Sequence, residues 1–248
     1  MYINDIHILI YVLVGVVGLF IGQFIDWCNK RLPEYKKVLS KEFFTEYMKH
    51  FKPNYLLMTI VAVSYLVLLY IFGISLDLFK YIALVPMLIS AFCIDFKLQI
   101  IPNRLNLTIF ETGLIFTFLN AIINTNLGIT TFTNSILGML VGGGIFLIIT
   151  VIGGVIAGKE AMGFGDVKLM GALGLFLGWI NIIIVSVIAF LLAAIISIGI
   201  LIFKRKHFGD YIPFGPFIVI ATLIVIFIPF DLLLTIVLKI FTLGMYQG

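Results

Sequence analysis

Charged residues are scarce in this chain of 248 residues. Only 11% are charged, whereas 62% are hydrophobic and the mean hydropathy is +1.22. A soluble domain carries about a quarter charged residues, so this chain has too few charges to cover a soluble surface. Disordered chains are excluded because they are poor in hydrophobic residues. The composition predicts an all-α protein that crosses a membrane several times.

Cysteine is also scarce, with Cys28 and Cys93 far apart and no CxxC pair. This excludes a disulfide scaffold and a cysteine-rich zinc site. His7, His50 and His207 are scattered along the chain, so the sequence predicts no metal site. The formal net charge of +4 does not indicate a nucleic-acid partner, because in a membrane protein the location of the charges matters more than their sum.

Long stretches without acidic or basic residues predict membrane-spanning helices, since about 20 apolar residues cross a bilayer core. We expect about eight spans. They lie within residues 6–25, 55–76, 81–94, 105–125 (interrupted by Glu111), 135–158, 169–203 (two spans) and 211–230. The break between the two spans of 169–203 is expected near residues 178–181.

The distribution of basic residues predicts how the chain is oriented. Cytosolic loops of membrane proteins carry an excess of Lys and Arg. With eight spans, 14 of the 16 basic residues fall in loops on one side. These loops are residues 30–54, 96–104, 159–168 and 204–210. We therefore expect them in the cytosol and the N-terminus outside, facing away from it.

Acidic residues near the spans call for an explanation, because an ionisable group at membrane depth is costly and commonly functional. The candidates are Asp26, Asp95, Glu111 and Asp166. Asp95 closes the third span and Asp166 precedes the sixth, so two spans separate them and both should reach the same face. Asp26 and Glu111 are interpreted as packing or interfacial groups, and the sequence assigns them no further role.

Two neighbouring carboxylates can hydrolyse a peptide bond. They cannot both ionise easily, so they share one proton. The ionised group takes a proton from water while the other donates one to the attacked carbonyl, without a metal. Near Asp166, Gly163 and Gly165 would allow unusual backbone conformations and a close substrate strand. Pro102 discourages helix after Asp95 and is counted with the active-site backbone.

Each of these features also has a plainer interpretation. A GxGD tetrapeptide alone is a weak motif. Asp95 could be an interfacial acid beside Lys97, and Lys97 and Lys168 are typical positive-inside anchors. The small residues at helical spacing are best explained by close helix packing. They are Gly171, Gly174 and Gly178.

Four segments together resemble the bacterial type 4 prepilin peptidases, which are GxGD intramembrane aspartic proteases. The segments are residues 18–33, 94–104, 163–169 and 212–217. The resemblance implies that Asp95 and Asp166 are the catalytic pair. Its implied substrates are prepilin or pseudopilin precursors, cut after a short basic leader at the cytosolic face of the bacterial inner membrane. It also implies a peptidase helix bundle over residues 55–248, after an N-terminal part of one helix and a basic loop, residues 1–54.

The N-terminal part departs from the family pattern. Many members hold zinc with two CxxC pairs in the first cytosolic loop, but residues 33–54 contain no cysteine. The usual GSFLN signature reads GQFID at residues 22–26. Many members also methylate the new N-terminus with S-adenosylmethionine. This second activity and its cofactor stay open for the chain, whereas the peptidase reaction needs no cofactor.

The main alternative is an ion-coupled transporter that uses Asp95 and Asp166 as a proton relay. Such a transporter should show helices broken at mid-membrane and a repeat between its halves, and the sequence shows neither. A presenilin-like protease would have Tyr before the first aspartate, where this chain has Ile94. An inactive membrane adaptor is disfavoured because both aspartates are present. The oligomeric state and the individual pilin-like substrate are not predicted.

Overall fold

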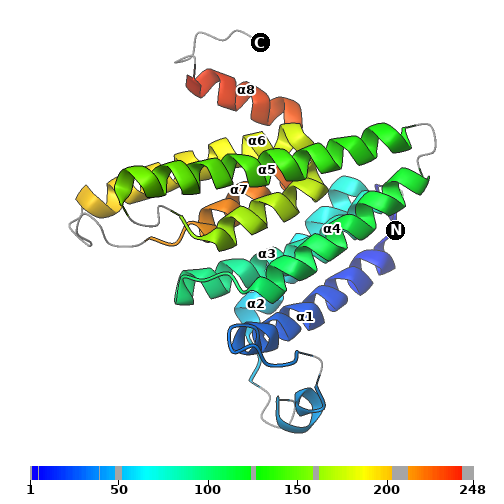
Figure 1. The fold of residues 1–248 in the computed structure, drawn as a ribbon. Coiled ribbons are helices and arrows are strands. Elements are labelled where there is room, and N and C mark those ends of the chain that lie inside the picture. Colours follow the sequence, from blue (N-terminus) through cyan, green and yellow to red (C-terminus); the bar gives the residue numbers. More distant parts are fainter. Residues whose placement is uncertain are drawn as a thin grey trace.

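The computed structural model describes residues 2–4, 6–38, 40–47, 52–123, 127–158, 162–202 and 212–241, and within them eight α-helices dominate (Figure 1). The helices are α1 (Ile8–Arg31), α2 (Tyr55–Phe72), α3 (Leu76–Leu98), α4 (Asn103–Ile123), α5 (Gly128–Ala157), α6 (Phe164–Ile202), α7 (Gly215–Phe227) and α8 (Phe230–Phe241). A short hairpin of β1 (Tyr2–Ile3) and β2 (Ile6–His7) precedes α1, and a π-helical turn, η1 (Phe43–Tyr47), follows it.

Six of these helices, α1 to α6, are long and apolar enough to cross a membrane. The predicted all-α polytopic membrane fold is therefore confirmed. The third span was expected at residues 81–94, but α3 begins at Leu76. Ser75 caps its first turn by accepting from the Leu78 amide, and Lys80 pairs with Asp77 at 2.6 Å. The charges that ended the predicted span are thus paired within the helix.

The predicted break in residues 169–203 lies at Gly178. Its φ of 78° and ψ of 174° are non-helical and interrupt α6, which continues on the far side. The amide of Trp179 donates to Asn134 Oδ1 of α5 at 3.3 Å, next to the interruption. With α6 divided at Gly178, and with the shorter apolar helix α7 added, the described chain has the eight apolar segments that were expected.

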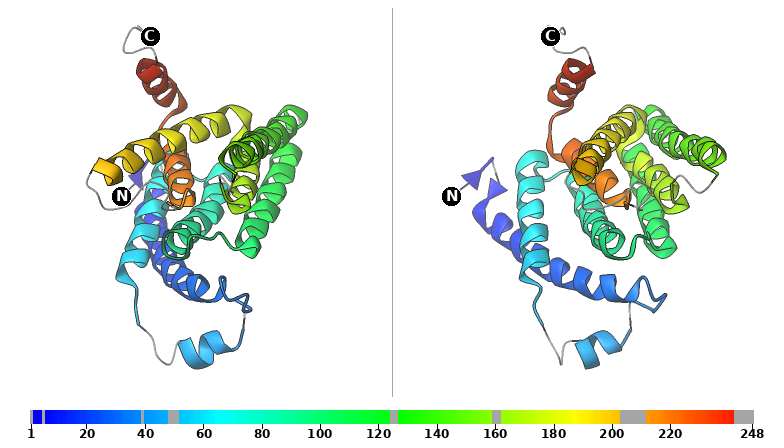
Figure 2. Two further views of the ribbon diagram at one scale, coloured as in Figure 1. Left: turned by 60° about the vertical axis from the view of Figure 1, so that its left-hand side comes forward. Right: turned by 90° about the vertical axis from the view of Figure 1, so that its left-hand side faces the viewer.

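The end of the last predicted span, residues 211–230, differs in the structure. Helix α7 ends at Phe227, and Pro229 precedes the separate helix α8. A proline lacks an amide hydrogen and disfavours helix in the residue before it, which accounts for the interruption. Helix α8 stands apart from the main bundle (Figures 1 and 2).

Helices α5 and α6 have the most extensive contact in the bundle, and glycines make it close. A side chain at Gly174 would collide with the backbone of Gly138, and one at Gly138 would collide with Gly174 and Gly178. Small residues let membrane helices approach closely, where dispersion replaces the hydrophobic effect. The interpretation of Gly174 and Gly178 as packing residues is confirmed, and this packing places the start of α6.

Helix α3 contains Pro86, which removes the amide that would bond to the carbonyl of Ile82. The buried hydroxyl of Tyr65 on α2 donates to that carbonyl at 2.9 Å. This bond satisfies the acceptor and ties α2 to α3. Helix α1 packs mainly on α2, across the boundary predicted between residues 54 and 55, and also on α3. The division into residues 1–54 and 55–248 stays a prediction.

The first loop is fastened to α1 by a polar network around Asp26. The Asp26 carboxylate accepts from Lys30 at 2.6 Å, Tyr47 at 3.0 Å and Asn54 at 3.0 Å. Burial, and then the Asp26 carboxylate, raise the pKa of Tyr47, so its hydroxyl stays a donor. Gln23 accepts from the Asn54 amide at 2.9 Å and donates to Tyr47. Asp26 therefore organises the loop.

Candidate active site

Asp95 and Asp166 come together at adjoining helix ends. Asp95 lies near the C-terminal end of α3 and Asp166 in the first turn of α6. Only 3% of Asp95 and 5% of Asp166 is exposed. Both line one cavity of about 470 Å³, and their carboxylates are close enough to interact electrostatically. The structure thus places the two acids at the same level of the bundle, as the sequence predicted.

Helix α3 ends about one turn after Asp95. Gln99 ends α3 in the left-handed conformation, with a φ of 56°, and its amide donates to the Asp95 carbonyl at 2.8 Å. Buried Pro102 directly precedes α4, and its carbonyl accepts from the Leu105 amide at 3.0 Å. The loop between these points sends Ile101 into the cavity. Pro102 ends the non-helical stretch as expected, but it is not among the residues that line the cavity.

Gly165, directly before Asp166, leaves space for a neighbouring side chain and has no unusual backbone angle. Gly165 lies in the first turn of α6 without a positive φ, so the expectation of a conformation closed to other residues is wrong for it. A Cβ on Gly165 would come within 3.3 Å of Ile101 Cβ. Gly163 lines the cavity and its carbonyl accepts from the Asp166 amide at 3.1 Å.

A residue that the sequence analysis did not single out, Gly215, completes the surroundings of Asp95. It begins α7, and its backbone amide lies against the Asp95 carboxylate. A Cβ at this position would lie 2.5 Å from Asp95 Oδ2. The N-terminal end of a helix carries partial positive charge, so α7 presents that charge to Asp95. The segment 212–217 was recognised as a motif, but only the tertiary structure shows that it lies against the Asp95 carboxylate.

Asn106 was also missed. It is 3% exposed on α4, and its Nδ2 donates to the carbonyl of Gly165 at 2.9 Å. Its Oδ1 is buried without a hydrogen-bond partner in the described part of the chain, as is Asp95 Oδ2. A buried acceptor without a donor is costly, so both oxygens are suited to receive a bound molecule.

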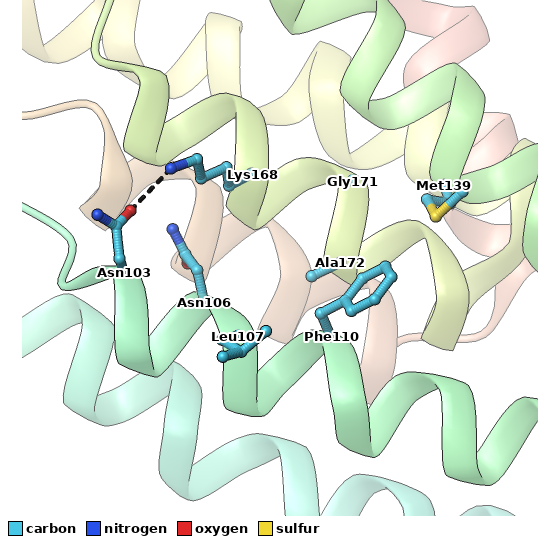
Figure 3. A pocket seen from close by; sticks show the side chains of 8 residues that line it. All are labelled: Asn103, Asn106, Leu107, Phe110, Met139, Lys168, Gly171 and Ala172. Carbon is cyan, nitrogen blue, oxygen red and sulfur yellow. Dashed lines mark hydrogen bonds between the residues drawn. The ribbon is translucent and has the colours of Figure 1, made fainter.

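The other charged candidates lie outside the carboxylate pair. Lys168 lines the cavity and donates to Asn103 at 2.8 Å, and Lys97 is exposed on α3 (Figure 3 shows Lys168). Asp95 forms no ion pair with Lys97 among the described residues. Glu111 is exposed in a shallow apolar hollow of α4. Asp26 lies in the loop network described above.

Within the described ranges, no group of three or more His, Cys, Asp or Glu side chains could hold a metal ion. His50 and His207 lie outside those ranges. The polar side chains that line the cavity are those of Asp95, Asp166, Lys168, Gln99 and Asn103.

The stretch that holds both aspartates, residues 82–198, matches the model of the type IV leader peptidase family. The matched stretch, which we call the leader peptidase region after the family model, begins within α3 and includes most of α6, so it contains Asp95 and Asp166 but not Gly215. The resemblance seen in the sequence is confirmed.

Individual relatives are consistent with this assignment. A "Prepilin leader peptidase/N-methyltransferase" of Aeromonas hydrophila is 31% identical over 134 residues, which is 54% of this chain and 44% of that protein. The Legionella pneumophila protein of that name is 31% identical over 156 residues, 63% of this chain and 52% of its own length. The Escherichia coli K12 protein of that name is 28% identical over 131 residues, which is 53% of this chain and 55% of that protein.

The chain spans about half the length of these curated relatives. The comparison with solved structures found no significant match to this chain.

Proposed function

We propose that this protein is a prepilin leader peptidase that uses Asp95 and Asp166 as its catalytic pair. The observation that carries the proposal is the meeting of two buried carboxylates in one cavity within the leader peptidase region. An ionisable group buried in a helical membrane bundle is costly, and two together are still more so. Catalysis by the pair accounts for that cost.

The two carboxylates take different roles in the proposed reaction. The Gly215 amide at the start of α7 faces Asp95 and stabilises negative charge there. Asp95 therefore takes the proton from the attacking water. Asp166 donates its proton to the carbonyl oxygen as the tetrahedral intermediate forms. When the intermediate collapses, Asp166 takes that proton back and Asp95 passes the proton from water to the leaving amine, which restores the pair. Peptide hydrolysis by this route needs two carboxylates and water, so we propose no metal and no cofactor for it.

The proposed substrate is a prepilin or pseudopilin precursor with a short basic leader followed by an apolar helix. The relatives carry the name prepilin leader peptidase, which supports this class of substrate. The multi-pass helices allow the substrate helix to stay in the bilayer while the leader reaches the cavity. We place the protein in the bacterial inner membrane with the cavity on the cytosolic side, where the basic loops lie.

Methylation of the new N-terminus is a separate question. The relatives' printed names include N-methyltransferase. In this chain the first loop has no cysteine and is fastened by Asp26, Tyr47 and Asn54 instead. We propose only the peptidase activity, and S-adenosylmethionine would be required only if methylation is retained. The proton-relay transporter finds no support in the matched relatives.

Co-expression with a precursor of this class tests the proposal. Asp95→Asn and Asp166→Asn should each lower the cleavage rate by at least about 10²-fold, because each removes one half of the acid–base pair. The double variant should lose little more than either single one, since the pair acts as a unit. Mass spectrometry of the product N-terminus reports the cut and any added methyl group.

Glu111→Gln is the matched control, because this acid is exposed on α4 away from the pair. It should cleave as the wild type does, and wild-type cleavage should survive a chelator. Cleavage by Asp95→Asn near the wild-type rate would remove Asp95 from the mechanism. Loss of activity on chelation, with recovery on adding zinc, would contradict metal-free hydrolysis.

A further inference from the structure

A groove lies between α4 and α6 (Figure 3). We call it the α4–α6 groove and define it by the residues that line it. They are Asn103, Asn106, Leu107, Phe110, Met139, Lys168, Gly171 and Ala172. Its volume is about 450 Å³. Polar side chains gather at one end of it, and apolar side chains and a glycine line the rest (Figure 3).

The polar end of the groove is continuous with the cavity of the two aspartates. Asn103 and Lys168 line both spaces and are joined to each other at 2.8 Å. From Asn103, α4 runs away from the aspartate end of the bundle, and Phe110 lies seven residues further along it. At about 1.5 Å per residue the groove follows α4 for roughly 10 Å, or two helical turns. It therefore runs from the aspartate cavity along α4, one of the helices long and apolar enough to cross a membrane.

The unpartnered Oδ1 of Asn106 indicates what the groove accepts. This oxygen is buried beside the polar end and needs a donor. A lipid acyl chain carries none. The first turn of a helix has backbone N–H groups without intrahelical partners, and a helix that begins just after the scissile bond would present them there.

We propose that the α4–α6 groove binds the first two turns of the substrate's apolar helix, on the carboxyl side of the scissile bond, with Asn106 Oδ1 accepting from a free backbone N–H of its first turn. This inference rests on the proposed function, since it assumes a polar leader followed by an apolar helix. The leader then remains on the side of the cavity away from the groove. Gly171 and Ala172 leave room for the helix against α6.

A larger apolar cavity, of about 630 Å³, offers the alternative. It lies on the other side of α4, where Thr108 and Leu105 line it together with residues of α1, α2 and α3. It shares no lining residue with the aspartate cavity, so a helix seated there is not led to the reacting carboxylates. Neighbouring residues of α4 thus face the two rival sites, and this makes a matched test available.

The first experiment is disulfide cross-linking in an Asp166→Asn, Cys28→Ala, Cys93→Ala background, which retains uncut precursor. The precursor carries single cysteines along its first eight apolar residues. Leu107→Cys should cross-link to it, and Thr108→Cys should not. Both positions are exposed on α4, so reactivity is matched. Cross-linking at Thr108 instead, or at neither position because lipid fills the groove, would overturn the proposal.

The second experiment fills the groove. Leu107 is 54% exposed, and Leu107→Trp should raise KM for the full precursor about tenfold while kcat stays within about twofold. The larger side chain would block binding of the substrate helix, whereas the carboxylates would stay in place. A short soluble peptide that ends before the apolar helix should be cleaved as by the wild type. Ile115→Trp, at a residue of α4 that is 56% exposed outside the groove, is the control.

The two proposals fail in different ways. If the Asp→Asn variants stop cleavage while Leu107→Trp leaves KM unchanged, the proposed peptidase function is supported and the proposed role of the groove is contradicted. If Leu107→Cys captures the precursor but wild-type protein never cuts it, the groove stands as a helix-binding site and the peptidase function is wrong.

Discussion

At the scale of single residues, Gly215 stands where any larger residue would press on the carboxylate of Asp95. Gly215→Ala would place a methyl group 2.5 Å from Asp95 Oδ2, closer than such atoms approach, so the carboxylate or α7 must shift. A displacement of about 1 Å in a catalytic group can cost on the order of 10²-fold in rate. We expect kcat for precursor cleavage to fall by about that factor.

The control for Gly215→Ala is Gly144→Ala in α5. No atom lies within 4 Å of a Cβ built at Gly144, so this variant should fold and cleave normally. Both variants should insert in the membrane to the wild-type level. Unchanged cleavage by Gly215→Ala would show that Asp95 can move without loss, and the proposed contact with α7 would then carry no function.

The two aspartates and Gly215 differ in what the sequence can reveal. Asp95 and Asp166 stand out because a carboxylate is rare and costly at membrane depth, and the count of spans between them predicts their shared level. Gly215 and Asn106 carry no such signal. Glycine is common in this chain, and Asn106 is one polar residue near a helix start. Their importance depends on contacts with Asp95 and Gly165, which only the packing of α3, α4, α6 and α7 creates.

At the scale of helices, the contact of α5 with α6 decides where Asp166 lies. Gly174→Ala should destabilise the bundle, because the new methyl group would overlap the Gly138 backbone, which cannot rotate away. Overpacking of this kind typically costs about 1–3 kcal/mol in the free energy of unfolding. Thermal unfolding in detergent, followed by circular dichroism, should show a lowered midpoint.

Gly171→Ala, one turn before Gly174 on α6, is the matched control. A Cβ there would meet the nearest atom, Gly143 Cα, at 3.7 Å, an ordinary contact. Its unfolding midpoint should equal or exceed that of the wild type, since alanine favours helix over glycine. Equal midpoints for the two variants would mean that α5 and α6 are not so closely packed in the membrane.

The Asp26 network gives a second prediction for an element, the first loop. Asp26→Ala removes the acceptor shared by Lys30, Tyr47 and Asn54, so the loop should open more often. Limited trypsin digestion should then cut faster at Lys36, Lys37 or Lys41. Glu34→Gln is the control, because its exposed pair with Lys36 contributes little. Equal rates of digestion for Asp26→Ala and wild type would contradict the proposal that Asp26 holds the first loop against α1.

Helix positions were easier to predict than helix ends. Apolar stretches located α1 to α5, because length in a bilayer is a strong constraint. The ends depend on capping residues and ion pairs, such as Ser75 and the Asp77–Lys80 pair at the start of α3. A search for stretches without charged residues excludes such a pair and so places the helix end too late. The break in α6 was predicted near residues 178–181. Asn134, which accepts from the Trp179 amide beside this break, lies on another helix and could not be identified without the fold.

At the scale of the whole molecule, the basic residues and the aspartates meet at one end of the bundle. Arg104 donates to the Lys36 carbonyl at 3.3 Å, and Lys168 donates to Asn103 beside the cavity. The first loop, the loop after α3 and the start of α6 therefore share one face. Residues 159–161 of the predicted loop 159–168, and the whole predicted loop 204–210, lie outside the described residues.

This arrangement makes the orientation testable with two cysteines in a Cys28→Ala, Cys93→Ala background. Lys37 is exposed in the first loop, and Ile74, 63% exposed, lies between α2 and α3 at the other end of α2. If the excess of Lys and Arg holds the first loop in the cytosol, a membrane-impermeant maleimide should label Ile74→Cys in intact cells. Lys37→Cys should be labelled only after the membrane is permeabilised. The reverse pattern would place the aspartates on the outer face, out of reach of a leader that has not crossed the membrane.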